Sequence, residues 1–135
     1  MDRLTRKRRS ALMSRIRGKD TAPEKILRSA LHKAGYRYTI HVRELSGCPD
    51  IVFPRRKKLI FVHGCFWHSH VSCRLGILPK SNLAYWRPKL RGNVRRDERN
   101  IRKLRRQGWS VLVVWQCNLK NLEACMSRVT RFLEK

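Results

Sequence analysis

The stretch from His63 to Cys73 constrains this chain more than any other segment. Its residues, His-Gly-Cys-Phe-Trp-His-Ser-His-Val-Ser-Cys, include three of the five histidines and two of the five cysteines in the chain. Two large aromatic residues, Phe66 and Trp67, lie between them. The loop predicted from residue 64 to residue 80 has little apolar content and almost no core of its own, so another kind of interaction must order it.

A bound metal ion is one way to order this loop. Cys65, His70 and Cys73 have the spacing C-x4-H-x2-C, and Cys117 follows a later apolar run. Three thiolates and one imidazole suit structural zinc, which is tetrahedral and takes all four ligands from the protein. The alternative is that these are ordinary buried cysteines and exposed histidines. The spacing favours the zinc site.

The charge of the chain indicates a polyanionic partner. Among its 135 residues, 33 Lys and Arg face 9 Asp and Glu, which gives a formal net charge of +24. Nucleic acid is the commonest cellular polyanion, and an anionic membrane surface is the alternative. No apolar run approaches the roughly 18 residues of a membrane span. The first residues are basic without the apolar segment of a secretory signal, so we expect a cytoplasmic protein whose cysteines are thiols or metal ligands.

The pattern of apolar residues predicts one α/β domain over residues 1–135. Residues 1–19 form a basic arm or helix that orders on nucleic acid, or else a solvated tail; Met13 and Ile16 belong to its short apolar stripe. The other predicted elements are, in order, a helix over 21–35, strands at 36–42, 50–53 and 59–62, a loop over 74–82, a basic helical segment over 83–107 interrupted near Pro88 and Gly92 and closed by Gly108, a central strand buried on both faces at 110–115, and a helix over 119–133.

Glu24 has two interpretations. Thr21-Ala-Pro-Glu24 has the form of a capping box, in which the Glu24 carboxylate reaches back to the start of its helix. Ile26, Leu27 and Leu31 belong to the predicted buried face of that helix. Because the chain has so few acidic residues, a catalytic role for Glu24 stays open, although the local pattern favours the cap.

A possible catalytic cluster contains Asp50, His63 and His68. The strands at 50–53 and 59–62 predict a hairpin, which places Asp50 roughly level with His63. Cleavage of a phosphodiester requires a metal to neutralise charge, a carboxylate to hold it, and a base for the attacking water. Asp50 suits a hard cation, and a histidine suits the base. If His70 binds zinc, either His63 or His68 can be that base.

Aromatic residues form the third group of interest. Phe66, Trp67 and Trp86 lie in or beyond a polar, charged loop, where large apolar side chains either bury or stack on nucleic-acid bases. Each such stack contributes about 1–3 kcal/mol, so several together offset the few kcal/mol needed to open a base step. Trp109 and Trp115 flank or occupy a strand and are expected in the core.

At these residues the sequence resembles the Vsr family, the very-short-patch mismatch repair endonucleases. The resemblance covers residues 10–117 and rests on His63-Gly-Cys-Phe-Trp-His68, Pro49-Asp50, Asn93-Val-Arg-Arg-Asp97 and Gly108-Trp-Ser-Val-Leu-Val-Val-Trp-Gln-Cys117. It implies a restriction-endonuclease-like core with a mixed central β-sheet flanked by helices and a zinc-stabilised loop. It also implies magnesium-dependent nicking of double-stranded DNA on the 5′ side of the T in a T:G mismatch, which arises when 5-methylcytosine deaminates.

The resemblance also implies roles for individual residues. Asp50 would hold the magnesium, with help from the backbone carbonyl of Val62. His68 would be the general base for the attacking water, and His63 would contact the scissile phosphate. Glu24 would orient water beside the metal, which displaces the capping interpretation without excluding it.

The remaining implied roles concern zinc and DNA. The zinc ligands agree with the spacing argument and are Cys65, His70, Cys73 and Cys117. The residues that would wedge into the major groove beside the mismatch are Phe66, Trp67 and Trp86. Met13 and Ile16 would approach from the minor groove, and Lys89 would contact the mismatch or a phosphate.

One departure from the wider nuclease superfamily supports this family in particular. That superfamily places an acid and a lysine on the third strand, where this chain has Phe61 and His63, and the Vsr pattern shares the loss. The expected protein acts in DNA repair as a monomer, since a nick in one strand needs one active site, and other mismatch-repair proteins are possible partners. The alternatives are a related nuclease of different specificity and a non-catalytic zinc-stabilised nucleic-acid-binding protein.

Overall fold

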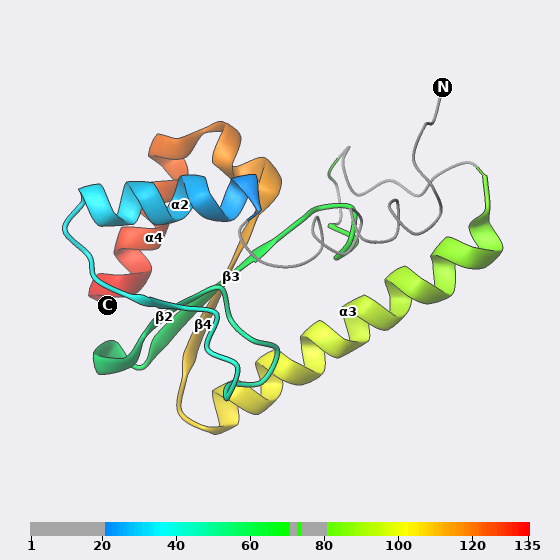
Figure 1. Ribbon diagram of the computed structural model, residues 1–135, viewed down its shortest axis with the longest axis horizontal. Coiled ribbons are helices and arrows are strands. Elements are labelled where there is room, and N and C mark those ends of the chain that lie inside the picture. Colours follow the sequence, from blue (N-terminus) through cyan, green and yellow to red (C-terminus); the bar gives the residue numbers. More distant parts are fainter. Residues whose placement is uncertain (1–20, 71–72, 74–80) are drawn as a thin grey trace.

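The computed structural model describes residues 21–70, 73 and 81–135. The predicted basic arm over 1–19, with Met13 and Ile16, and most of the predicted loop over 74–82 lie outside the described residues. The elements of the described part are α2 (Ala22–Lys33), β1 (Thr39–Ile40), β2 (Ile51–Phe53), the 3₁₀ helix η1 (Pro54–Arg56), β3 (Lys58–His63), α3 (Leu83–Arg106), β4 (Ser110–Trp115), the 3₁₀ helix η3 (Gln116–Lys120) and α4 (Leu122–Glu134) (Figure 1).

The described strands form one mixed sheet in the order β1-β2-β3-β4. β1 pairs antiparallel with β2, and β2 pairs antiparallel with β3, so the predicted hairpin is confirmed. β3 and β4 run parallel, with pairs from Lys58↔Ser110 to His63↔Trp115. A parallel pair needs a long crossover connection, and α3 lies within it. The α/β class and the mixed sheet are therefore confirmed.

Strand β4 lies at an edge of this sheet, so its predicted central position is wrong. The two central and most buried strands are β2 and β3. The continuous apolar run of β4 has another cause, because helices cover both of its faces. Leu112 and Val114 face the cluster that contains α2 and α4, while Val111 and Val113 pack with residues around α3.

Two apolar clusters, one on each face of the sheet, hold the helices in place. The first joins the sheet to α2, η3 and α4 through Leu27, Leu31, Ile51, Phe53, Ile60, Val114, Leu119, Cys125, Val129 and Leu133. The second joins it to α3 through Val52, Leu59, Phe61 and Leu104. Figure 1 shows α2 and α4 on one side of the strands and α3 on the other. Burial of these side chains is the main force that fixes the strands beneath the site.

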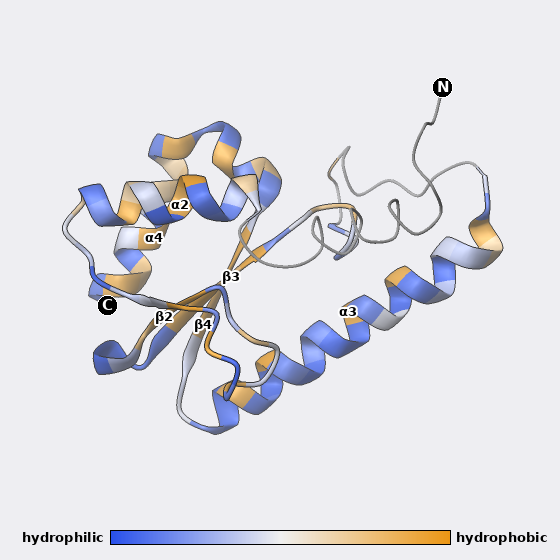
Figure 2. Ribbon diagram, viewed as in Figure 1, coloured by the Kyte–Doolittle hydropathy of each residue, from blue (hydrophilic) through white to orange (hydrophobic). Residues whose placement is uncertain are grey.

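Helix α3 is continuous, so the predicted interruption near Pro88 and Gly92 is wrong. Pro88 lies inside the helix and removes one backbone hydrogen bond. The buried residues of the helix, Leu90, Asn93 and Leu104, all follow Pro88 and hold this part of it against the rest of the molecule. The 24 residues of α3 span roughly 36 Å at 1.5 Å per residue. Most of α3 is hydrophilic (Figure 2), and none of the described helices has the length and apolarity to cross a membrane.

The first two elements are shorter than predicted. α2 starts after Thr21, whose hydroxyl accepts a hydrogen bond from the Glu24 N–H, and it buries Leu27 and Leu31. Ile26 is 46% exposed, so its predicted burial is wrong. The predicted strand over 36–42 pairs only at Thr39–Ile40. The next residue, His41, has a φ of 50°, and this left-handed backbone cannot continue a strand.

The last helix also begins later than predicted. Leu119 belongs to η3, and α4 begins at Leu122, where the Asn121 side chain accepts a hydrogen bond from the Ala124 N–H. At the other end of α4, the Lys58 ammonium donates to the carbonyls of Phe132, Leu133 and Lys135 at 2.6, 3.0 and 3.1 Å. A cation at a helix C-terminus satisfies carbonyls that have no partner within the helix.

We expect Lys58→Met to lower the free energy of unfolding by about 1–2 kcal/mol, because it removes these charge-assisted hydrogen bonds. Arg55→Met is the matched control, since it removes the same charge from an exposed side chain of the same turn. Urea unfolding of both variants measures the difference. Equal stability of the two variants would contradict the role assigned to Lys58.

Candidate active site and metal centre

The buried ends of β2 and β3 meet at Asp50. Asp50 directly precedes β2, and one of its carboxylate oxygens accepts a hydrogen bond from the Val62 N–H at 2.6 Å. Burial raises the pKa of Asp50 to about 8, and the nearby Glu24 carboxylate adds to this, while the Val62 N–H and Arg28 act in the opposite direction. A buried carboxyl of this kind becomes a carboxylate at neutral pH when a cation lies beside it. Asp50 is therefore suited to hold a divalent cation.

Glu24 is the second carboxylate at this position. Although Thr21 caps α2, the Glu24 side chain does not serve the cap: its Oε2 lies 2.6 Å from His41 Nε2 and 3.1 Å from Arg28 Nη1. The side chain is 1% exposed. The capping interpretation of the carboxylate is thus wrong. Glu24, His41 and Asp50 offer ligand atoms that all lie within 4.8 Å of one another.

A second histidine–carboxylate pair lies at the start of the loop. His68 Nδ1 hydrogen-bonds to Asp97, which projects from the middle of α3. An ionised carboxylate only accepts, so Nδ1 carries the proton and Nε2 keeps its lone pair. The His68 side chain is 26% exposed. Its geometry is that of an imidazole held in one tautomer and open to a water molecule.

His63 stacks on His68. Their ring centroids are 3.8 Å apart and the rings are nearly parallel, at 5°. His63 is buried, and its Nδ1 has no hydrogen-bond partner among the described residues. Burial, together with the neighbouring His68, lowers the pKa of His63 to about 4. His63 is therefore neutral at pH 7 and can offer one N–H donor without a formal charge.

The predicted zinc ligands come together. Cys65, His70, Cys73 and Cys117 have ligand atoms within 4.8 Å of one another, and Cys117 Sγ lies 3.4 Å from His70 Nδ1. Tetrahedral zinc with Zn–S bonds of about 2.3 Å requires sulfur atoms about 3.8 Å apart. Burial, aided by Cys73 and Cys117, raises the pKa of Cys65 to about 12, so a thiolate there needs a cation. The donor set fits zinc, and it joins the loop to Cys117 in η3, two residues after the end of β4.

Trp115 lies between this cluster and the histidines. Its ring stacks on His70, with centroids 4.1 Å apart at 7°, and meets the His63 ring edge-on at 5.2 Å. Trp115 is only partly buried, so the expectation of a simple core residue is wrong. Trp109, by contrast, packs against the cluster beneath α3 as expected. Trp115 therefore connects the cysteine cluster to the candidate catalytic side chains.

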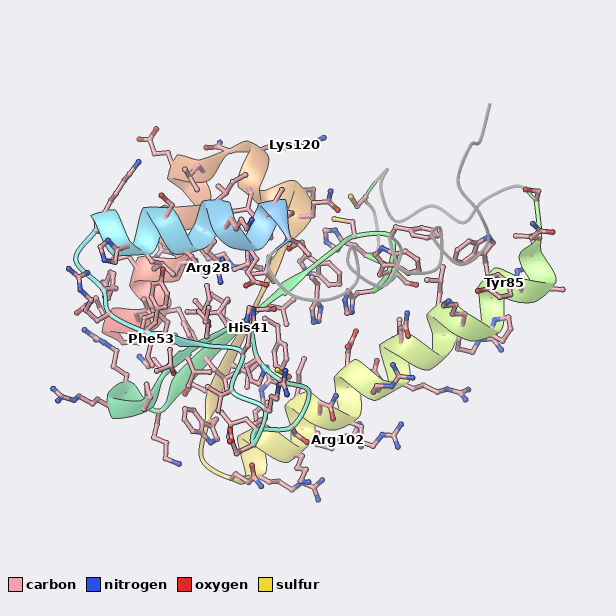
Figure 3. All side chains as sticks on the ribbon, in the orientation of Figure 1. Arg28, His41, Phe53, Tyr85, Arg102 and Lys120 are labelled. Atoms are coloured by element: carbon pink, nitrogen blue, oxygen red, sulfur yellow. The ribbon has the colours of Figure 1, made fainter. Side chains whose placement is uncertain are left out.

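Phe66, Trp67 and Trp86 form one aromatic group. Their ring centroids are 5.0–5.8 Å apart with edge-to-face geometry, and Asn93 of α3 donates to the Trp67 carbonyl at 3.1 Å. Lys89 lies over the rings of Trp67, Trp86 and Tyr85 at 5.2–5.9 Å. Tyr85 extends the group, is 56% exposed, and lies near the N-terminal end of α3 (Figure 3). The aromatic group is half-buried, so its outer rings remain open to a partner.

A cleft of about 860 Å³ connects these parts. Its lining includes both histidine–carboxylate pairs, Asp50, Val62 and the aromatic residues Phe66 and Trp67. Arg96 of α3 also faces it. A cleft with a carboxylate suited to a cation and an oriented imidazole, in a chain of net charge +24, has the chemistry of a phosphodiester-cleaving nuclease.

Three residues of this site carried no assigned role in the sequence. His41 and Asp97 pair with Glu24 and His68, and Tyr85 extends the aromatic group. Asp97 had a usable signal, because it is one of 9 acidic residues and stands in a helix of ten Lys and Arg. His41 had no such signal in the sequence, where it falls within the predicted strand over 36–42.

Comparisons with known proteins agree with this class. The family model described as "DNA mismatch endonuclease Vsr" matches residues 1–75. The "Type II nicking enzyme V.XorIIP" of Xanthomonas oryzae pv. oryzae (strain KACC10331 / KXO85) is 52% identical over 133 residues, which cover 98% of this chain and 97% of that protein. The "Type II nicking enzyme V.NmeAIP" of Neisseria meningitidis serogroup A / serotype 4A (strain DSM 15465 / Z2491) is 40% identical over 134 residues, which cover 99% of this chain and 95% of that protein.

A third relative carries a different description. The "DNA mismatch endonuclease Vsr" of Escherichia coli (strain K12) is 42% identical over 115 residues, which cover 85% of this chain and 73% of that protein. The chain therefore belongs to the Vsr family and is a strand-nicking DNA endonuclease. The alternative of a non-catalytic nucleic-acid-binding protein is wrong.

We expect Cys117→Ser to release bound zinc and lower the melting temperature, because the loop loses its connection to η3. Metal analysis of the purified protein together with a thermal melt tests this. Cys48→Ser is the control, since Cys48 lies outside the cluster, and it should keep its metal. Unchanged zinc content in Cys117→Ser would remove Cys117 from the ligand set.

Proposed function

We propose that this protein nicks double-stranded DNA on the 5′ side of the T in a T:G mismatch and so starts very-short-patch repair of deaminated 5-methylcytosine. The observation that carries the proposal is the His68–Asp97 pair beside Asp50 in a cleft whose rim holds the aromatic group. The family model and the Escherichia coli relative, both described as mismatch endonucleases, support this specificity.

Magnesium is the proposed catalytic cation, held by Asp50 and the backbone carbonyl of Val62. In an antiparallel strand pair, the N–H and C=O of one residue point to the same side. Because the Val62 N–H points at the Asp50 carboxylate, the Val62 carbonyl faces that side as well. A divalent cation bound there would neutralise charge on the phosphate.

His68 is the proposed general base. Its Nδ1 is held by Asp97, which leaves Nε2 to take the proton from the attacking water. Asp97 orients the imidazole and stabilises the imidazolium that forms, as an aspartate does beside a catalytic histidine in hydrolases. Because the imidazole is already held in one tautomer and one orientation, no entropy is lost in orienting it when the reaction takes place.

His63 and Glu24 serve the same reaction in other ways. His63 is neutral because burial lowers its pKa to about 4, so we propose that it donates a hydrogen bond to the scissile phosphate. Glu24, buried and paired with Arg28 and His41, is proposed to orient water beside the cation. Both residues are therefore proposed to position reactants without exchanging protons with them.

The aromatic group is proposed to recognise the mismatch. Phe66, Trp67 and Trp86 would wedge into the major groove, where stacking of about 1–3 kcal/mol per base offsets the opening of a base step. A T:G pair stacks and pairs less well than a matched pair, which lowers that cost. Lys89, held over two of these rings, would contact the mismatch or a phosphate.

The fold and the cluster of cysteines complete the proposal. A mixed sheet with helices on both faces supports a restriction-endonuclease-like core, and one sheet that joins all the described elements supports a single domain over residues 1–135. Structural zinc at Cys65, His70, Cys73 and Cys117 would hold the loop. One active site is enough for one nick, so the working unit is proposed to be a monomer.

Incubation with Mg²⁺ and three duplexes that differ only at one base pair, T:G, C:G or T:A, tests the function. We expect a nick in the strand carrying T of the T:G duplex and intact strands in the C:G and T:A duplexes, because only the mismatch lowers the cost of opening the base step. Denaturing gel electrophoresis with each strand labelled separately reports the cut strand and position. Equal cleavage of all three duplexes would refute mismatch recognition while leaving the nuclease assignment intact.

A second candidate specificity has a specific observation in its favour. Two of the compared relatives are described as type II nicking enzymes. Nicking by this chain would then depend on a defined sequence around the cut. A library of T:G duplexes with randomised flanking bases separates the two, since nicking confined to one flanking sequence supports the second candidate.

We expect His68→Ala to lower the nicking rate by about 10²–10⁴-fold, the usual contribution of a general base. Asp97→Asn should also lower the rate, because it favours the wrong tautomer of His68. Single-turnover kinetics measure both variants, and gel-shift binding to the T:G duplex should be nearly unchanged. Full activity of His68→Ala would refute its role as the base.

A further inference from the structure

The cluster of Glu24, His41 and Asp50 contains one group that the proposed function leaves unused, the His41 imidazole. We propose that His41 is a nitrogen ligand to the cation at Asp50, and that it lets this site accept Mn²⁺ and similar transition-metal ions in addition to Mg²⁺. The inference rests on the proposed cation site and assigns it a further ligand and a cation preference.

The geometry places the imidazole where a ligand would lie. His41 Nε2 is 2.6 Å from Glu24 Oε2, and the ligand atoms of both residues and Asp50 lie within 4.8 Å of one another. A cation bound there would displace the proton that Nε2 shares with Glu24, so that the nitrogen lone pair becomes available to the cation. An octahedral cation with ligands at about 2.1 Å places neighbouring ligand atoms about 3 Å apart. The His41 and Glu24 side chains are 11% and 1% exposed, so both face the interior of the site. Figure 3 shows His41 close to the strands, near Arg28 on α2.

The backbone holds His41 beside Asp50. The His41 N–H donates to the Asp50 carbonyl at 3.4 Å, just beyond the end of the β1–β2 pairing. With a φ of 50°, the residue adopts a left-handed conformation that only Gly, Asn, Asp and His visit with any ease. Asparagine at position 41 therefore keeps the backbone and replaces the imidazole with an amide.

The chemistry of an imidazole ligand predicts a shift in cation preference. Mg²⁺ binds oxygen ligands in a near-ideal octahedron and gains little from nitrogen. Imidazole favours later divalent ions, and affinity rises from Mn²⁺ towards Cu²⁺ for a given nitrogen-containing site. A site made of the Asp50 carboxylate, the Val62 carbonyl and an imidazole thus binds Mn²⁺ better than the same site without the imidazole.

The test uses the zinc-loaded full chain with Mn²⁺ and a T:G duplex. Electron paramagnetic resonance counts the bound Mn²⁺, and pulsed measurements detect coupling to the ¹⁴N of a histidine ligand. We expect this coupling in the wild type, its loss in His41→Asn, and a fall of at least ~10-fold in Mn²⁺ affinity. His32→Asn is the matched control, because His32 is an exposed histidine of α2, and it should behave as the wild type.

Two further samples separate the alternatives. His68→Ala should keep the nitrogen coupling, which excludes the nearby catalytic histidine as its source. In nicking assays, His41→Asn should lose much more rate with Mn²⁺ than with Mg²⁺, whereas a residue that only orients Glu24 would lower both rates equally.

The proposal is overturned if the wild type binds no Mn²⁺, if the bound Mn²⁺ has no ¹⁴N coupling, or if His41→Asn keeps that coupling. Failure of the proposed function gives a different result, since it would leave the T:G duplex uncut by the wild type with Mg²⁺. A wild type that nicks with Mg²⁺ but lacks the coupling therefore refutes the His41 role alone.

Discussion

The hydrogen bond from the Val62 N–H to the Asp50 carboxylate is the interaction on which the rest of the site depends. It joins the start of β2 to the end of β3, the two most buried strands of the described sheet. A carboxyl buried to this extent is unfavourable unless a donor or a cation satisfies it. Because the donor belongs to the backbone of a core strand, the position of the carboxylate is set by the packing of the whole sheet.

Two groups of candidate catalytic side chains adjoin Asp50 in the cleft. On one side of Asp50 lie Glu24 and His41, which come from the start of α2 and the end of β1. On the other side, β3 leads to His63 and into the loop that carries His68, whose partner Asp97 comes from α3. The described elements thus hold two carboxylate–histidine pairs, Glu24–His41 and His68–Asp97. Packing of α2 and α3 on opposite faces of the sheet brings these pairs to one cleft.

The loop depends on a different kind of interaction. Among its described residues, Cys65, His70 and Cys73 meet Cys117 in one cluster, and the Asn93 side chain donates to the Trp67 carbonyl. Trp115 contacts both His70 and His63, so the cysteine cluster and the candidate catalytic side chains share a neighbour. Disturbance of the cysteine cluster is therefore expected to reach the histidines through one aromatic ring.

The sequence by itself determined which residue types could do the chemistry. The β2–β3 hairpin, the cap at Thr21 and the end of α3 just before Gly108 are local signals and are confirmed, and the four predicted zinc ligands come together. The position of each strand in the sheet and the contacts between distant residues depend on tertiary packing, which local sequence signals do not contain. The edge position of β4 and the continuity of α3 through Pro88 follow from packing on both faces of the sheet. The pairs Glu24–His41 and His68–Asp97 join residues 17 and 29 positions apart, and only the folded chain brings them together.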